Sequence, residues 1–156
     1  MIFENYKLVI FDADGTLREC TVNGQEYPIN QDQWIPKATI VNEISKYNWI
    51  TKHFGIATNQ PGITRNEFLE ETCIELIEEM VMKAFGYLPP QDALQYCPHH
   101  IDGGCDCRKP QPGMLKRIMA FYKVEASQTL FVGDSNQDKG AAENAGCDFI
   151  WVHEIK

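Results

Sequence analysis

The sequence predicts an α/β fold in three layers, with a parallel sheet between two layers of helices. Short apolar runs, typical of strands buried on both faces, alternate with segments whose apolar residues recur at helical spacing. Strands and helices that alternate in this way form right-handed crossovers, which make the strands parallel. Polar residues directly follow three of the strands, at the edge where open α/β sheets bind ligands. We therefore expect one site at the carboxyl edge of the sheet.

The composition is that of a single globular domain, which we expect to span residues 1–156. Apolar residues make up 44% of the chain and charged residues 23%, which is ordinary for a globular protein. The net charge of −8 opposes a phosphate backbone and disfavours nucleic acid as a partner. No apolar run could span a membrane, and the first residues lack the pattern of a signal peptide. We expect a cytoplasmic monomer, in which six cysteines favour metal binding or buried thiols over disulfides.

The first strand is predicted at Leu8–Phe11 and ends abruptly in Asp12 and Asp14, with Gly15 allowing a sharp turn. A calcium-binding loop also contains the pattern D-x-D-G. Aligning Gly15 with the invariant glycine of that loop places the apolar Ile10 at the first ligand position, so the register fails. An ordinary turn rich in Asp and Gly is the alternative for this stretch taken alone.

The next segment, residues 17–35, is polar and contains the turn signals Asn23-Gly24 and Tyr27-Pro28, which predict a small β-flap beside the site. Pro36 suits the first position of a helix, where its missing N–H costs nothing. Apolar residues then follow at helical spacing: Ile40, Val41, Ile44 and Tyr47.

A second buried strand is predicted at Phe54–Ala57, followed by Thr58-Asn59-Gln60. The sequence Thr64-Arg65-Asn66-Glu67 has the form of a capping box and predicts the start of the longest helix. Gly86 predicts its end. The glutamates of this helix fall on the side opposite its apolar residues and indicate a solvated face.

The rest of the chain continues the alternation of strand and helix. We expect a short strand at 94–96, a helix from Pro112, a strand at 130–132, a helix closed by Gly146 and a strand at 149–152. The third polar cluster, which contains Asp134, directly follows the strand at 130–132. Residues far apart in the sequence can therefore converge on one edge of the sheet.

The polar residues that follow the strands can together carry out phosphoryl transfer. Asp12 is a candidate nucleophile, because a carboxylate that attacks phosphorus forms an aspartyl-phosphate and divides hydrolysis into two easier steps. Asp14 could act first as general acid toward the leaving oxygen and then as base toward water. Two carboxylates would repel a phosphate, so we expect Mg²⁺, with Asp134 as a further carboxylate. Thr58 and Lys109 offer a hydroxyl and a cation to the transferring group.

Four stretches resemble, in order, the motifs of the haloacid dehalogenase (HAD) superfamily, and they span nearly the whole chain. These are Asp12-x-Asp14-Gly15-Thr16, Thr58-Asn59-Gln60, Lys109 and Gly133-Asp134-Ser135-x-x-Asp138. The resemblance implies a Rossmann-like, HAD-like fold. No segment is long enough for a large cap domain, so we expect an open site bordered by the flap and nearby loops.

The resemblance also implies the role of each residue. It makes Asp12 the nucleophile and Asp14 the acid/base residue, with Mg²⁺ held by the Asp12 and Asp134 carboxylates and by the backbone carbonyl of Asp14. The remaining roles concern the substrate: Thr58 and Lys109 on the phosphoryl group, and Asn59 and Arg108 in orienting the substrate.

Three cysteines and a histidine have the spacing C-x-H-x5-C-x-C, which fits a closed tetrahedral site for structural Zn²⁺. The set is Cys97, His99, Cys105 and Cys107. We expect a zinc loop at residues 97–107 that orders the chain directly before Arg108 and Lys109 and so positions both cations. His100 is the competing imidazole, and a set of free surface thiols is the alternative. The other cysteines, which are Cys20, Cys73 and Cys147, lack spaced partners and are expected to be packing residues.

The cysteine segment also resembles a narrower branch of the superfamily. Cys97-Pro98-His99 and Cys105–Pro110 are similar to those of the histidinol-phosphate phosphatases and the D-glycero-D-manno-heptose-1,7-bisphosphate phosphatases, and this pattern favours His99. The short loop between His99 and Cys105 resembles the first group, whereas the residues around Asn59 and Arg108 resemble the second. Ala13 departs from the arginine usual between the two aspartates in both groups. The substrate therefore stays open at this point.

We expect a phosphatase that acts on a phosphate monoester of a small metabolite, either a sugar phosphate or bisphosphate or histidinol phosphate. Polynucleotide 3′-phosphatases share the catalytic core, so a DNA end is the alternative substrate, although the chain lacks a stripe of Lys and Arg. A catalytically silent binding module stapled by zinc is the alternative of another class. The intact Asp12, Asp14, Lys109 and Asp134 argue against it. We expect neither nucleic acid nor a membrane as a partner.

Overall fold

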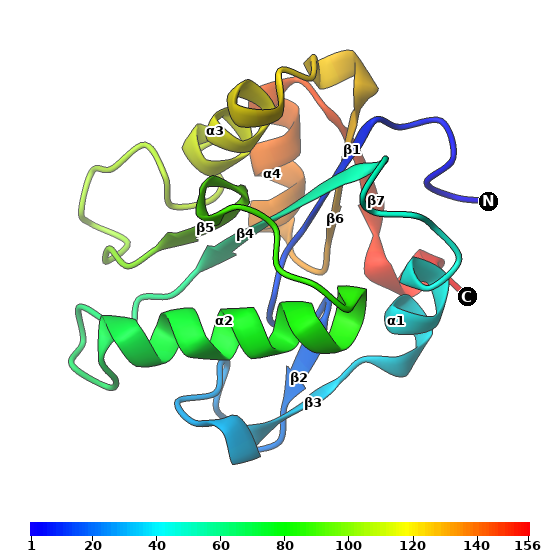
Figure 1. Ribbon diagram of the computed structural model, residues 1–156. Coiled ribbons are helices and arrows are strands. Elements are labelled where there is room, and N and C mark those ends of the chain that lie inside the picture. The colour runs from blue at the N-terminus through cyan, green and yellow to red at the C-terminus, as the bar shows by residue number, and fades with distance from the viewer.

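The computed structural model describes residues 1–156 and shows a five-stranded parallel sheet between two layers of helices (Figure 1). The strands lie in the order β5 (Leu94–Cys97), β4 (His53–Asn59), β1 (Leu8–Phe11), β6 (Thr129–Gly133) and β7 (Asp148–Trp151). The three-layer α/β fold class is confirmed, and no segment of the chain forms a separate cap domain. None of the helices is long and apolar enough to cross a membrane.

Alternate side chains of β1 point to opposite faces of the sheet, as the pleat of a strand requires. Val9 and Phe11 belong to one core, together with residues of α1 (Ala38–Ile44) and α2 (Glu70–Phe85). Leu8 and Ile10 belong to the other core, with α3 (Gly113–Tyr122) and α4 (Asn136–Ala145). Because both faces are covered, all four side chains of β1 are fully buried, and this explains the uninterrupted apolar run in the sequence.

A second, antiparallel pair of strands, β2 (Arg18–Cys20) and β3 (Trp34–Pro36), projects beside the carboxyl edge of the sheet. The loop between these strands is tied to the segment before α2, since Tyr27 stacks on Phe68 and its hydroxyl donates to Glu67 at 2.9 Å. These contacts hold the loop against the body of the domain.

The predicted start of the first helix at Pro36 is wrong. Pro36 lies in β3, opposite Arg18, and α1 begins at Ala38 after an extended Lys37. The backbone N–H of Lys37 donates to the carbonyl of Leu17 at 3.0 Å. The hydrogen bonding between this segment and β2 therefore extends beyond Pro36. Proline is accommodated at the edge of a two-stranded ribbon because no backbone N–H is required at that position.

The predicted capping box at Thr64–Glu67 is also wrong, because α2 begins only at Glu70. The Thr64 hydroxyl donates to the carbonyls of Pro61 and Pro98, at 3.1 and 2.7 Å, instead of capping a helix. Asn66 adopts a left-handed backbone with φ of 58°, which interrupts any helix there.

The predicted helix ends at glycine are confirmed. Gly86 follows α2 with φ of 82°, and Gly146 follows α4 with φ of 81°. Both lie in the left-handed region that glycine enters without the cost of a Cβ atom, and so their backbone N–H groups can close the last helical turns. The chain then turns back toward the sheet.

Candidate active site

A polar cleft of about 500 Å³ opens at the carboxyl edge of the sheet, between the ends of β1, β4 and β6 and the loop that follows β2. All the residues that the sequence predicts for catalysis, substrate binding and Mg²⁺ line it: Asp12, Asp14, Thr58, Asn59, Arg108, Lys109 and Asp134. They come from positions spread over most of the chain, and the parallel sheet brings them together.

Gly15 allows two loops of the site to approach closely. Its φ is 82°, and a Cβ atom at this position would lie 1.8 Å from Oδ2 of Asp134. The loop after β1 can therefore meet the loop after β6 only with glycine here. This close approach places the carboxyl groups of Asp12 and Asp134 in one cluster.

The carboxylates of Asp12, Asp134 and Asp138 each place an oxygen within 4.8 Å of the others. Burial raises the pKa of Asp12 well above its ordinary value, despite the opposing charge of Lys109 and with the charges of Asp138 and Asp134 adding to the shift. Partial desolvation likewise raises the pKa of Asp134, which opens onto the cleft. Clustered carboxylates that disfavour their own charge fit a hard divalent cation such as Mg²⁺.

The Asp14 side chain lies outside that cluster. Its carboxylate instead accepts hydrogen bonds from Arg18 and from Gln60, and Gln60 also donates to Thr58 Oγ1 at 2.9 Å. Asp14 could offer a cation either its carboxylate or its backbone carbonyl. Because Arg18 and Gln60 already bind the carboxylate, the backbone carbonyl is the group that remains for a cation at the Asp12 cluster.

Lys109 is a buried cation of the site, with 4% of its surface exposed. Its ammonium donates to Asp12 Oδ1 at 2.7 Å, to Asp138 Oδ1 at 2.6 Å and to the carbonyl of Ala57 at 2.9 Å. Burial would lower the pKa of Lys109, but the two carboxylates outweigh it and raise the pKa. Lys109 is therefore charged and held by all three donors of its ammonium.

Asp138 is the anchor of Lys109, a role that the sequence did not reveal. Its Oδ2 accepts from the backbone N–H groups of Asp134 and Ser135, at 3.0 and 3.2 Å, in a capping box at the start of α4. Burial would raise the pKa of Asp138, but Lys109 and these hydrogen bonds hold it below its ordinary value. The spacing Ser135-x-x-Asp138 could have predicted the capping box at the start of α4. It gave no indication that Asp138 also contacts Lys109.

Asn59 and Arg108, the predicted substrate-orienting residues, both line the cleft but have different surroundings. The Asn59 amide brackets the backbone of Lys109, accepting from its N–H at 3.1 Å and donating to its carbonyl at 3.4 Å. Arg108 is half-buried and donates to the carbonyl of His99 at 3.2 Å. Asn59 therefore also helps to place Lys109.

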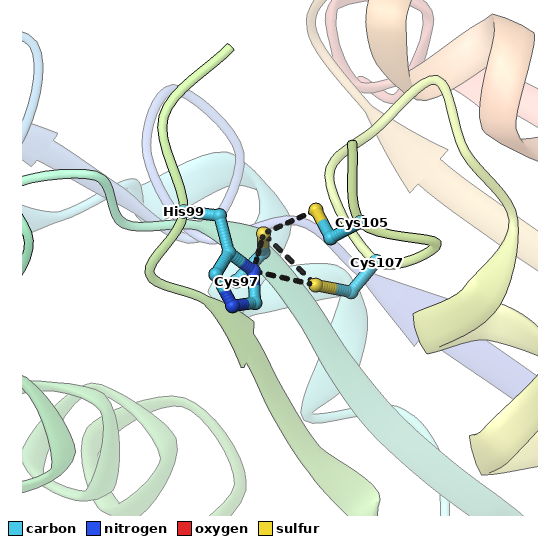
Figure 2. A group of neighbouring side chains, drawn as sticks. All are labelled: Cys97, His99, Cys105 and Cys107. Carbon is cyan, nitrogen blue, oxygen red and sulfur yellow. Dashed lines mark hydrogen bonds between the residues drawn. The ribbon is translucent and has the colours of Figure 1, made fainter. Parts of the chain in front are cut away.

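The predicted zinc ligands come together beside this loop, at the end of β5 (Figure 2). Cys97 Sγ lies 3.3 Å from His99 Nδ1, 3.7 Å from Cys105 Sγ and 3.0 Å from Cys107 Sγ. Tetrahedral zinc with Zn–S bonds of about 2.3 Å spaces its sulfur ligands about 3.8 Å apart. The four donors thus have the chemistry and roughly the spacing of a structural Zn²⁺ site. All cysteines are free thiols, and His100 lies outside the cluster.

The cysteine and histidine cluster is linked directly to the polar cleft. The backbone N–H of Arg108 points to Cys105 Sγ at 3.4 Å, one residue before Lys109. Although burial opposes it, this contact and hydrogen bonds from Cys107 lower the pKa of the Cys105 thiol to about 6, which favours the thiolate that binds metal. A metal held here would fix the start of the loop that carries Arg108 and Lys109.

Sequence comparison finds relatives over almost the whole chain. A D-glycero-beta-D-manno-heptose-1,7-bisphosphate 7-phosphatase of Pseudomonas aeruginosa is 35% identical over 148 residues, which cover 93% of this chain and 80% of the relative. The corresponding protein of Pseudomonas putida is 33% identical over 153 residues, covering 94% and 82%. The chain belongs to this family of HAD-like phosphatases.

The solved structures agree with this family. The chain superposes on the D,D-heptose 1,7-bisphosphate phosphatase of B. bronchiseptica, complexed with magnesium and phosphate, with a TM-score of 0.74 and 31% identity. The match covers 91% of this chain and 78% of that one. A family model described as HAD-hydrolase-like also matches residues 106–154, the part of this phosphatase that contains Lys109, β6 and α4. The resemblance to HAD phosphatases is confirmed.

Two residues that contact Asp14 in this phosphatase were not predicted. Arg18 lies in a polar stretch with no motif, and Gln60 follows Thr58-Asn59 in a motif that indicates no role for it. No local pattern could have revealed the contact of Gln60, because it reaches Asp14 across 46 residues of sequence. The contact of Arg18 depends on the turn that Gly15 allows.

Proposed function

We propose that this phosphatase hydrolyses a phosphate monoester of a small sugar, with a heptose 1,7-bisphosphate as the first candidate substrate, through an aspartyl-phosphate. The proposal depends above all on the carboxylate of Asp12, which lies at the end of β1 with Lys109 Nζ 2.7 Å from its Oδ1. A buried nucleophile beside a fixed cation is suited to attack on a phosphoryl group. The names of the relatives supply the candidate substrate.

In the first step an oxygen of Asp12 attacks phosphorus, and the bond from phosphorus to the alcohol oxygen breaks. Asp14 gives its proton to that oxygen as it leaves. In the second step Asp14 takes a proton from water, whose oxygen attacks the aspartyl-phosphate and releases phosphate and the Asp12 carboxylate. Lys109 stays charged throughout and faces the negative charge on the phosphoryl group. The Thr58 hydroxyl lies at the cleft wall, where it can donate to a phosphoryl oxygen.

Both metals have a fitting set of residues. The carboxylates of Asp12 and Asp134 and the carbonyl of Asp14 would hold Mg²⁺, which when bound neutralises the charge of phosphate against these acids. The four residues of the cysteine and histidine cluster would hold a structural Zn²⁺. In this proposal the zinc keeps Arg108 and Lys109 in place and takes no part in the chemistry.

A phosphatase screen with Mg²⁺ tests the proposal. The panel contains a heptose 1,7-bisphosphate, other sugar phosphates, histidinol phosphate, nucleotides and a 3′-phosphorylated oligonucleotide. Asp12→Asn should abolish hydrolysis of every substrate and keep the fold. Asp92→Asn, at an exposed position away from the cleft, should leave hydrolysis unchanged.

Equal activity of wild type and Asp12→Asn would refute the nucleophile. Activity confined to histidinol phosphate or to the oligonucleotide would keep the aspartyl-phosphate chemistry but replace the sugar as substrate. No hydrolysis of any phosphoester by the Mg²⁺-loaded wild type would leave a catalytically silent module instead.

A further inference from the structure

Arg18 is a buried cation that takes no part in the proposed steps of phosphoryl transfer. It is the largest of the fully buried side chains, with 1% of its surface exposed, and Asp14 is its only carboxylate partner. We propose that Arg18, together with Gln60, is a positioning residue that holds the carboxyl group of Asp14 toward the leaving oxygen of the substrate. This inference rests on the proposed role of Asp14 as acid and base.

The contacts fix both oxygens of Asp14. Arg18 Nε donates to Oδ1 at 2.8 Å, and its Nη2 donates to Oδ2 at 3.4 Å. Gln60 Nε2 donates to the same Oδ2 at 2.8 Å. A forked guanidinium fixes the plane of a carboxyl group as well as its position. The Asp14 side chain keeps 18% of its surface exposed, on the side that lines the cleft.

Backbone hydrogen bonds hold Arg18 in place beside Asp14. Gly15 N–H donates to the carbonyl of Arg18 at 2.8 Å, and Arg18 N–H donates to the carbonyl of Ala13 at 3.2 Å, which closes a tight turn around Asp14. On its other side Arg18 pairs with Pro36 in the β2–β3 ribbon. The backbone of Arg18 is therefore anchored independently of Asp14, and it directs the buried guanidinium toward the carboxyl group.

Stability does not explain a charge at this position. Arg18 Nη1 and Gln60 Oε1 are both buried and have no hydrogen-bond partner. Such groups cost free energy, and a buried ion pair often contributes less to folding than apolar side chains of the same volume would. Both residues that bind the Asp14 carboxylate therefore destabilise the fold through an unpaired polar atom. This free-energy cost indicates that their role is to position Asp14.

The orientation of an acid matters only for a leaving group that needs a proton. A sugar alcohol must be protonated as it leaves, whereas p-nitrophenolate leaves without help. Loss of correct orientation at Asp14 should therefore slow the first turnover of a sugar phosphate and spare that of p-nitrophenyl phosphate. Damage to the fold, to Asp12 or to Lys109 would slow both first turnovers alike.

The experiment uses Arg18→Met, which keeps the length of the side chain, and compares first-turnover rates for both substrates by rapid mixing. Loss of general acid catalysis should lower the rate on the sugar phosphate by roughly 100-fold, with KM nearly unchanged. The burst of p-nitrophenolate should stay within about threefold of wild type, and the later steady state should be slow because Asp14 must also act as base. Arg18→Lys should restore part of the lost rate.

Lys46→Met is the control, since it removes another cation–carboxylate pair, at 2.7 Å from Glu43, and neither residue lines the cleft. It should leave both rates unchanged. Equal slowing of the two substrates by Arg18→Met, or a wild-type rate on the sugar phosphate, would overturn the inference. If Arg18→Met does not fold, Gln60→Met must show the same selective loss on the sugar phosphate, and equal slowing there overturns it too.

Failure of the proposed function looks different from failure of this inference. If Asp12→Asn retains the burst, the aspartyl-phosphate itself is wrong. If the burst depends on Asp12 but neither Arg18→Met nor Gln60→Met separates the two substrates, only the positioning role fails.

Discussion

Replacement of Asp138 by asparagine keeps the shape of the side chain but removes the charge that faces Lys109. In the wild type, Oδ1 lies 2.6 Å from Lys109 Nζ, while Oδ2 accepts from two backbone N–H groups. An asparagine can keep its oxygen on the backbone groups. Its amide nitrogen then faces the ammonium of Lys109, so that two donors meet where a charged hydrogen bond was.

The structure sets the size of the effect. A hydrogen bond to a charged group contributes about 1.5–3 kcal/mol, and breaking a buried ion pair costs about 3–5 kcal/mol. Lys109 keeps its hydrogen bonds to Asp12 and to the carbonyl of Ala57. We therefore expect a loss at the lower end of the range for a buried ion pair, about 3 kcal/mol in the free energy of unfolding. Because Lys109 loses one of three anchors beside Asp12, the proposed nucleophile, kcat should fall by roughly 100-fold, since misplacing a catalytic group by about 1 Å can cost that much.

Urea unfolding and kcat on p-nitrophenyl phosphate measure the two effects. Ser135→Ala is the control, because it removes the hydroxyl that accepts from Asp138 N–H at 3.2 Å but leaves Lys109 untouched. It should cost about 1 kcal/mol, as for the loss of a helix cap, and keep kcat near the wild-type value. The reasoning is refuted if Asp138→Asn keeps wild-type kcat or is no less stable than Ser135→Ala.

Three further predictions concern other parts of the molecule. Cys105→Ser should lower bound zinc, measured by metal analysis of the purified protein, whereas Cys20→Ser should retain it; unchanged zinc in the first variant would contradict the proposed ligand set. Gly15→Ala should cost about 1–2 kcal/mol in unfolding free energy and raise the Mg²⁺ concentration needed for activity, because its Cβ would displace Asp134; an unchanged Mg²⁺ requirement would contradict this. A hydrogen bond from Lys46 lowers the pKa of Glu43, although burial opposes the shift. The carboxylate therefore stabilises the fold above its unfolded-state pKa, and this contribution is lost as pH falls through the lower folded-state pKa. Glu43→Gln should accordingly cost about 1 kcal/mol at neutral pH, and this cost should shrink as pH falls through the folded-state pKa; a pH-independent loss would count against the pair.

The sequence by itself determined the sheet and the approximate place of the site. Parallel strands covered on both faces are apolar throughout, and so the run at Leu8–Phe11 indicated a strand buried on both faces. The ends of α2 and α4 could be predicted because the left-handed conformation at Gly86 and Gly146 is a property of glycine itself. The cysteine and histidine spacing was equally local. These signals depend on residues close together in the chain.

The tertiary structure decided the helix starts and the partners of the side chains proposed for catalysis. The Thr64 hydroxyl donates to the carbonyl of Pro98, which lies 34 residues away, and so it does not cap a helix. The local capping pattern therefore predicted a wrong helix start. The anchoring of Lys109 by Asp138 likewise joins a loop residue to the first turn of α4, 29 residues away. Such contacts depend on strand register and on the path of each loop after its strand. Neither is encoded in a short stretch of sequence, and both are set only when the whole sheet packs.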